Sequence, residues 1–346
     1  MIIEEVLKNK NILFFSVQTF NLEKEIVKKL TELGANVDYY DERPLNNNLT
    51  KGIIRLKRSL VQNIINKYYN KILLETSNKH YDFLFVNKGE VVPEFFLKSF
   101  KKVHTESQCI FYTWDSFSNN KHALSILKYF DRKFSFDSDD AQNYGLDFRP
   151  LFYLDFYKDI DQISNVKIKN DLLFLGTAHS DRYKISNSIA NWCDTNALKA
   201  YCYYYMQGRL VYYFKRIFDK TFKEFDYKKL SFVSLESSDL FDLYQKSKVI
   251  LDINHPWQKG LTMRTFEAIG AKRKMITTNA EIRQYSFYNP NNILIIDRDN
   301  IKINRSFFES NYEEVDKVLY EKMSLKGWIS CLFMDKEPNV WIKEIN

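Results

Sequence analysis

Arg264 and Glu267 lie three positions apart, shortly after the pair Lys259-Gly260, in the stretch VILDINHPWQKGLTMRTFEAIGAKRKMITTN (249–279). Side chains at this spacing share one face of a helix. At a helix N-terminus, free N–H groups favour phosphate, and Lys259 or Arg264 would add charge-assisted hydrogen bonds to a diphosphate. The Glu267 carboxylate, one turn further in, could accept both hydroxyls of a ribose. The structural alternative is a surface i, i+3 salt bridge on an ordinary helix.

Strands and helices must position these side chains. The sequence predicts them from apolar runs that alternate with segments of helical period. The first half predicts strands at 12–17, 36–40, 83–86, 109–112 and 133–136, with helices at 22–33 and 53–74. The second half predicts strands at 172–175, 200–205, 231–234, 248–253, 274–278 and 293–296, with helices from 182, at 239–245 and at 261–269. This alternation favours an α/β fold of two Rossmann-like domains, each with a parallel sheet, that face one another across a cleft. Ligands of such sheets bind beyond the carboxyl ends of the strands, so we expect a site in the loops after Gly176, Ile253 and Thr278.

A length of 346 residues suits two domains. We expect an N-terminal domain at 1–154, a polar linker at 155–170, a C-terminal domain at 171–330 and a tail at 331–346. The segment 312–333 is helical in period and could pack back across the linker, and the tail could pack back on the N-terminal domain.

Charge and cysteine usage exclude several classes of protein. The net charge of +7, from 51 Lys and Arg against 44 Asp and Glu, is modest and spread along the chain. No nucleic-acid-binding motif accompanies it, so a nucleic-acid partner is not expected. Four cysteines show no metal-ligand spacing. The charged N-terminus and the lack of any long apolar run predict a cytoplasmic protein, with the inner face of the cell membrane as an alternative location.

The 249–279 stretch resembles the donor-binding motif of GT-B glycosyltransferases, especially the CgeB-like and capsule or lipopolysaccharide enzymes, in which an R-x-x-E-A helix precedes a small-residue turn and a strand. Four other stretches are similar to the same group: YTWDSFSN (112–119), FSFDSDDAQNYGL (134–146), LFLGTAHSDRY (173–183) and LYQKSKVILDINHP (243–256). The resemblance covers both halves in the expected order. It implies a GT-B enzyme that moves a sugar from a nucleotide-diphosphate donor to a growing surface glycan or lipid-linked acceptor.

By this resemblance Glu267 binds the nucleotide ribose, while Arg264, Lys259 and the amides near Gly260 hold the diphosphate. Gly176 lets the first loop of the C-terminal domain approach the donor, and Arg182 is a further phosphate candidate. Many retaining members carry a glutamate eight positions before the ribose-binding one, and here that position is Lys259. Retention of configuration is therefore not implied.

His255 follows a buried strand, where its imidazole could donate a hydrogen bond to the diphosphate or the donor sugar. An inverting enzyme also needs a base for the acceptor hydroxyl, and Asp115 and Glu90 both follow predicted strands. Asp115 is preferred because Tyr112 and Trp114 could form a wall on which a sugar stacks. The structural alternatives are a backbone-bonded His255, a turn-capping Asp115 and a solvated Glu90.

The run Asp137-Ser138-Asp139 resembles the D-x-D metal motif of another glycosyltransferase class, but it follows a strand and precedes a helix, which suits helix capping. We therefore expect no metal and no cofactor, with the nucleotide sugar as substrate. The segment 201–229 interleaves aromatic and basic residues, either for peripheral contact with an anionic membrane or as a strand and a helix with a solvated basic face. The alternative function is a non-catalytic two-lobed sugar- or nucleotide-binding protein, or an inactive transferase partner subunit.

Overall fold

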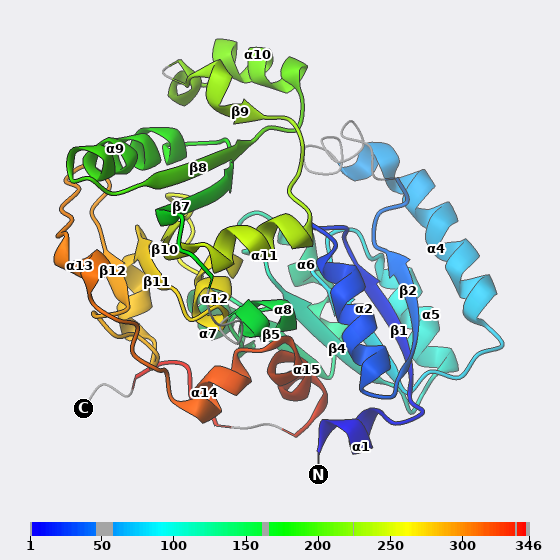
Figure 1. Cartoon of the computed structure of the whole chain (residues 1–346). Helices are drawn as coiled ribbons and strands as arrows, with labels where there is room; N and C mark the ends of the chain where they lie inside the picture. The colour runs from blue at the N-terminus through cyan, green and yellow to red at the C-terminus, as the bar shows by residue number, and fades with distance from the viewer. Residues whose placement is uncertain (1, 46–57, 161–165, 224, 336–337, 344–346) are drawn as a thin grey trace. The chain divides into compact units, whose positions relative to one another are not determined.

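The computed structural model describes residues 2–45, 58–160, 166–223, 225–335 and 338–343. The chain forms two compact units. The first holds the described residues of 1–150 and 325–339, and the second holds those of 151–324 and 340–343. Each unit contains a six-stranded sheet in which all neighbouring strands are parallel, with helices packed around it (Figure 1). The predicted fold class, α/β with two Rossmann-like domains, is confirmed.

The first sheet has the strand order β2-β1-β3-β4-β5-β6. Its strands are β1 Asn11–Ser16, β2 Asn36–Asp41, β3 Phe83–Asn87, β4 Gln108–Thr113, β5 Arg132–Ser135 and β6 Asp147–Phe148; its helices are α1 Ile3–Leu7, α2 Leu22–Glu32, α4 Gln62–Thr76, α5 Glu94–Val103, α6 Lys121–Ile126, α7 Ser138–Tyr144 and α15 Leu325–Phe333. Alternate residues of the buried strands face opposite sides, so Phe15 and Val86 join the main core, whereas Phe85 packs against Trp328 of α15 with ring centroids 5.8 Å apart.

The second sheet has the strand order β12-β11-β10-β7-β8-β9. Its strands are β7 Asn170–Thr177, β8 Ala200–Tyr205, β9 Leu230–Ser231, β10 Ser247–Asp252, β11 Lys274–Thr277 and β12 Ile293–Ile295; its helices are α8 Asp155–Asp159, α9 Arg182–Thr195, α10 Arg209–Phe218, α11 Ser237–Gln245, α12 Met263–Gly270, α13 Ser306–Glu309 and α14 Lys317–Lys322. The core of this unit is a continuous cluster that includes Leu172, Phe174, Val249, Leu251 and Ile276.

The limits of the two units differ from the expected ones. The expected linker 155–170 contains α8, whose Tyr157 is buried and lies edge-on to Tyr244 with centroids 4.9 Å apart. Ile160 is buried as well, so the described start of this segment packs within the second unit. The expected C-terminal domain ran to residue 330, but α15 belongs to the first unit, and residues 340–343 return to the second.

Three expected elements also differ. The strand expected at 231–234 is the two-residue β9, and part of the helix expected at 53–74 lies outside the described residues. The helical period of 312–333 is divided between α14 and α15. The break has a physical cause, because the Met323 carbonyl accepts a hydrogen bond from the Tyr153 N–H at 2.9 Å instead of continuing one helix. Across the described ranges, no helix has both the length and the apolarity needed to span a bilayer.

Candidate functional site

The topology of the second unit gives it one favoured place for a ligand. From β7 the chain runs outward to β8 and β9, then returns to build β10, β11 and β12 on the other side of β7. The loops after β7 and β10 therefore leave the sheet in opposite directions, and open α/β sheets bind ligands in the crevice between such loops. Gly176 lies at the end of β7, and Lys259 and Gly260 lie in the loop between β10 and α12.

Arg182, the first residue of α9, joins these two loops. Its Nε donates to the Ile253 carbonyl at 2.9 Å and its Nη1 donates to the Thr177 carbonyl at 3.3 Å. Burial lowers the pKa of the guanidinium to about 10. A Cβ on Gly176 would lie 2.8 Å from the Phe174 ring and 3.4 Å from Arg182 Nη1. A glycine is thus needed at position 176 for close packing inside the second unit. The sequence analysis had predicted a different role for it, contact with the donor.

Arg264 and Glu267 are brought together on α12. Arg264 Nη1 lies 2.8 Å from Glu267 Oε2 and 2.8 Å from the Tyr244 hydroxyl oxygen, while its Nη2 donates to the Leu175 carbonyl at 2.9 Å. The Tyr244 hydroxyl also donates to Glu267, at 2.8 Å. Burial opposes the charge of Arg264, but Tyr244 and Glu267 hold its pKa above the ordinary value.

The contact between Arg264 and Glu267 tests the structural alternative, which was a surface salt bridge on an ordinary helix. An i, i+3 ion pair is present, but it is not a surface pair, because the side chains of Arg264 and Glu267 are only 21% and 15% exposed. Arg264 fastens α12 to the end of β7 through the Leu175 carbonyl and holds one oxygen of Glu267. Its guanidinium therefore positions the carboxylate near the end of β7.

Asp252, the last residue of β10, fixes the start of α12. It is fully buried and accepts hydrogen bonds from the Thr262 hydroxyl, at 3.0 and 2.9 Å, and from the Thr265 hydroxyl, at 3.2 Å. Burial raises the pKa of Asp252 against the effect of these bonds and of nearby Arg264. Thr262 is the N-cap residue, and its side chain does not cap the helix. The first N–H groups of α12 are therefore left without that side-chain acceptor, as an anion site requires.

The loop after β10 carries the other predicted donor ligands. His255 and Lys259 are exposed, whereas Gly260 is buried and its carbonyl accepts from the Gln258 side chain at 2.9 Å. The His255 ring lies 5.9 Å, between centroids, from that of His179 in the loop after β7. Burial, with Arg182 nearby, lowers the pKa of His179 to about 3, so this ring is neutral.

Arg298, which the sequence analysis did not identify, ties three loops of this region together. It donates to Asp181 Oδ2 at 2.7 Å, to the Asn254 carbonyl at 2.8 Å and to the Thr278 hydroxyl at 3.1 Å. An open cavity of about 590 Å³ lies beside it, with Arg283 and Lys302 in its lining. The only local signal was the polar run Asp297-Arg298-Asp299 directly after a strand.

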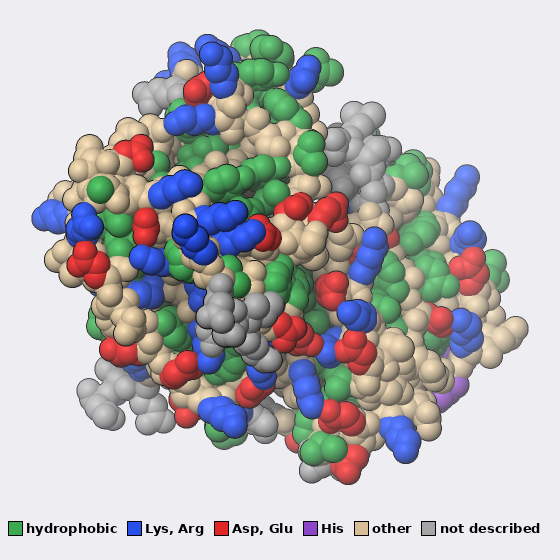
Figure 2. Space-filling view, in the orientation of Figure 1, with side chains coloured by type: hydrophobic (Ala, Val, Ile, Leu, Met, Phe, Trp, Pro, Cys, Tyr) green, Lys and Arg blue, Asp and Glu red, His purple; other side chains and the backbone are tan. Residues whose placement is uncertain are grey.

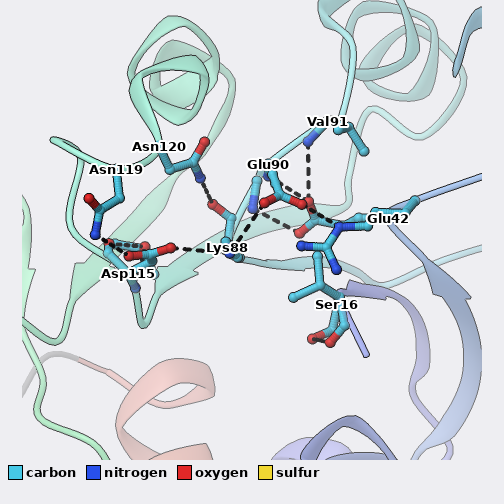
Figure 3. A network of polar contacts seen from close by, with 12 residues as sticks. Ser16, Glu42, Lys88, Glu90, Val91, Asp115, Asn119 and Asn120 are labelled. Carbon is cyan, nitrogen blue, oxygen red and sulfur yellow. Dashed lines mark hydrogen bonds and ion pairs between the residues drawn. The ribbon is translucent and has the colours of Figure 1, made fainter. Parts of the chain in front are cut away.

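The first unit has a second polar site, at the switch point between β1 and β3 (Figure 3). Glu42, just after β2, is completely buried, and its carboxylate accepts the backbone N–H groups of Gly89 at 2.8 Å, Glu90 at 2.6 Å and Val91 at 3.4 Å. Burial raises the pKa of Glu42 to about 8. Lys88 has a φ of 97°, which is uncommon for a residue with a side chain. The turn after β3 is thus strained, and the Glu42 carboxylate holds it through these backbone hydrogen bonds.

Both candidate bases belong to this network. Glu90 is buried and pairs with Arg43, at 2.5 Å, and with Lys88, at 3.4 Å. Although burial opposes ionisation, Arg43 and Lys88 hold the pKa of Glu90 below its usual value. Asp115 accepts from Lys88 at 3.1 Å and from Asn119 at 3.1 Å, and its side chain is 28% exposed. Glu90 is therefore not the solvated loop charge of the structural alternative, and Asp115 is the more accessible carboxylate.

The aspartates of the D-x-D run behave as helix residues. Asp137 is the N-cap of α7, and its side chain accepts the N–H groups of Asp139 at 3.0 Å and Asp140 at 3.1 Å. The capping interpretation of this run is confirmed. The sequence analysis did not identify Asp252, Lys88 or Glu42. Asp252 ends a buried strand and Lys88 directly follows one, so the position of a polar residue at a strand end was a usable signal for these two.

No protein-family model matches this chain, and neither does any curated protein. Solved structures do resemble it. An alpha-glucosyltransferase in complex with UDP and a 13-mer DNA containing a central A:G mismatch shares 12% sequence identity at a TM-score of 0.56, over 94% of this chain and 96% of that chain. Sucrose-phosphate synthase from Thermosynechococcus elongatus shares 10% identity at a TM-score of 0.54, over 94% of this chain and 95% of that chain.

The DNA belongs to the glucosyltransferase structure, but its presence means that the comparison gives no support to the expected lack of a nucleic-acid partner. At such low identities the likeness concerns the fold. Both matches extend over nearly the whole chain, across both α/β units. The fold of this protein is therefore the two-unit Rossmann-like fold of the GT-B class.

Proposed function

We propose that this protein is a glycosyltransferase that transfers a sugar from a nucleotide-diphosphate donor to a growing bacterial surface glycan without a metal ion. The observation that carries the proposal is the polar constellation at the β7–β10 switch point: a glycine-containing strand end, a helix N-terminus, two loops joined by Arg182, and the Glu267 carboxylate held by Arg264. The glucosyltransferase that shares the fold contains UDP, which supports a nucleotide donor.

In this proposal Glu267 accepts the ribose hydroxyls, and Arg264 positions Glu267 through their 2.8 Å contact. The diphosphate lies against the first N–H groups of α12, with Lys259 and Arg182 as nearby cations. His255, exposed in the same loop, donates a hydrogen bond to the diphosphate or the sugar. These groups stabilise the negative charge that builds up on the departing diphosphate, which is the work a metal ion does in other transferases.

The acceptor is assigned to the first unit. Asp115 takes the proton from the acceptor hydroxyl as the new glycosidic bond forms and the bond to the diphosphate breaks. Lys88, 3.1 Å from Asp115, holds the carboxylate in place. Tyr112 is fully buried beneath Trp328, with ring centroids 4.8 Å apart, so it supports the strand end and does not offer the sugar-stacking surface expected of it.

A second function has one observation in its favour. Arg264 and Glu267 already satisfy each other, and a partly buried ion pair of this kind suits a structural helix in a non-catalytic nucleotide- or sugar-binding protein, or in an inactive partner subunit. Turnover separates the two functions, because only a transferase releases nucleotide from a donor sugar.

The test incubates the protein with UDP-, GDP-, dTDP- and CMP-sugars, with and without EDTA and with bacterial glycan or glycolipid extracts as acceptor, and measures released nucleotide. We expect release from one nucleotide family, unaffected by EDTA and lost in folded Asp115→Asn and Glu267→Gln. Glu32→Gln and Glu309→Gln, which change exposed ion pairs with Lys29 and Arg305, are matched controls and should retain activity. A folded wild-type protein that binds a donor but releases nucleotide from none would establish the non-catalytic function instead.

A further inference from the structure

Helix α10 carries an apolar stripe on its outer side. Five large apolar residues of this ten-residue helix are exposed: Leu210 (85%), Tyr213 (54%), Phe214 (64%), Ile217 (72%) and Phe218 (71%). Their spacing of i, i+3, i+4, i+7 and i+8 places them along one face of the helix. Figure 2 shows hydrophobic side chains next to Lys and Arg side chains over α10, at the top of the view. An exposed apolar surface of this kind marks an interaction site.

The opposite face of α10 is fastened to the second unit. Tyr212 is buried, and its ring lies 5.1 Å from that of Tyr227. Arg216 Nη1 donates to the Tyr212 hydroxyl at 2.7 Å, and Lys215 lies 4.9 Å above the ring of Phe222. The helix therefore has a conventional buried face, and the exposed stripe is an additional apolar face that this attachment does not use.

The charges around the stripe are mostly positive. Residues 209–229 contain seven Lys or Arg and three Asp or Glu, a net charge of +4. Two of the acidic side chains are engaged locally, since Asp219 accepts the Thr221 N–H and Asp226 accepts the Lys228 N–H, each at 2.9 Å. Lys220 and Lys223, just beyond the helix, are exposed. An apolar stripe bordered by cations complements the anionic headgroups and acyl boundary of a lipid bilayer.

We infer that α10 docks this protein on an anionic lipid surface. Phe214, Ile217 and Phe218 enter the boundary between headgroups and acyl chains, and the cations at the edges of the stripe bind lipid phosphates. The helix lies in the plane of the interface and does not cross the bilayer. This inference stands apart from the proposed sugar transfer, because it rests on α10 alone and makes no use of the β7–β10 crevice.

The experiment is sedimentation of the full chain with vesicles of phosphatidylglycerol and phosphatidylcholine in equal parts, and with vesicles of phosphatidylcholine alone. We expect binding to the anionic vesicles only, weakened by added salt. Phe214→Ser with Ile217→Ser should lower the partition coefficient about a hundredfold, which is about tenfold for each apolar side chain. Lys220→Gln with Lys223→Gln should lower it about fivefold for each charge.

Leu74→Ser on α4 and Val318→Ser on α14 are the matched controls, because both are exposed apolar residues of other helices, at 77% and 64%. Both variants should sediment like the wild type. Failure of the folded wild type to bind either vesicle, or equal binding by Phe214→Ser with Ile217→Ser, overturns the inference. A concentration-dependent dimer that this double variant abolishes, with no vesicle binding, would assign the stripe to contact between two copies of the chain.

Discussion

The Lys88 ammonium lies between two carboxylates, 3.4 Å from Oε1 of Glu90 and 3.1 Å from Oδ2 of Asp115. These are the two residues that strand-end position selects as candidate bases. Their environments separate their roles. Glu90 also binds Arg43 within a buried network. Asp115 is the more exposed carboxylate, and it pairs with Lys88 at the edge of this network. One carboxylate thus belongs to the buried network of the strained turn after β3, and the other keeps part of its side chain exposed to solvent.

Substitution of the two carboxylates should have different effects. Asp115→Asn should lower kcat by roughly 10²- to 10⁴-fold, the usual contribution of a general base, with little change in stability. Glu90→Gln removes the carboxylate that pairs with buried Arg43, leaves Lys88 paired with Asp115, and should cost about 3–5 kcal/mol of unfolding free energy. Urea unfolding and kcat measured on both variants check this assignment. A stable Glu90→Gln protein without activity, beside an active Asp115→Asn protein, would reverse the two roles.

Arg264 should tolerate no replacement, even by another cation. Its planar guanidinium contacts Glu267, Tyr244 and the Leu175 carbonyl at once, which an ammonium cannot reproduce. Arg264→Lys should therefore destabilise the protein by about 2–4 kcal/mol and lower its melting temperature. The control is Arg305→Lys, whose exposed i, i+4 pair with Glu309 should be worth less than about 0.5 kcal/mol. Equal melting temperatures for the two variants would contradict the positioning role of Arg264.

Gly270 should be required for the packing of α12. A Cβ at this position would lie 2.6 Å from Cγ of Tyr153, a buried ring that lies 5.1 Å from that of Tyr320. Gly270→Ala should therefore cost about 1–3 kcal/mol of unfolding free energy, through overpacking. Gly208→Ala is the control, because a Cβ there would have no heavy atom within 4 Å. Chemical denaturation of both variants tests the difference, and a neutral Gly270→Ala would show that Tyr153 can move.

Acid should destabilise the protein through His122. Nε2 of this ring lies 2.8 Å from the Val92 carbonyl and must carry the proton, so Nδ1 accepts from Arg58 at 2.6 Å. Burial, aided by Arg58, lowers the pKa of His122 to about 4. Its contribution is therefore complete above the ordinary pKa near 6.5 and is lost as the pH falls through 4, by up to about 1.4 kcal/mol per pH unit.

His122→Gln keeps an acceptor for Arg58 and a donor for Val92 but does not titrate. Unfolding free energies at pH 7 and pH 5 should therefore differ less in this variant than in the wild type. An unchanged difference would show that the acid sensitivity has another source, with His179, whose pKa burial lowers to about 3, as the next ring to replace.

The strands were predictable where they are buried on both faces, because β1, β3, β4, β7 and β10 are nearly continuous apolar runs. The two-residue strands β6 and β9 are too short to show a periodic pattern of apolar residues in the sequence. The expected linker shows a different limit, since its described part contains two buried hydrophobic residues, Tyr157 and Ile160, in a segment of mostly polar composition.

At the candidate site, local spacing predicted the contact of Arg264 with Glu267 but not its surroundings. The bonds from Arg264 to Leu175 and from Arg298 to Asp181 join residues 89 and 117 positions apart, which no local pattern encodes. The role of Lys88 depends on a positive φ and on a partner 27 positions away, Asp115, that only the parallel pairing of β3 with β4 brings near.

A nucleotide-sugar site at the β7–β10 switch point is best tested by calorimetric titration of the wild-type protein with UDP-, GDP-, dTDP- and CMP-sugars, repeated with Glu267→Gln and with the control Glu309→Gln. We expect one binding site per chain for one nucleotide family, with affinity about tenfold or more weaker in Glu267→Gln and unchanged in Glu309→Gln. A folded wild-type protein that binds none of these donors, or a Glu267→Gln variant that binds as tightly as the wild type, would contradict a nucleotide-sugar site at the β7–β10 crevice.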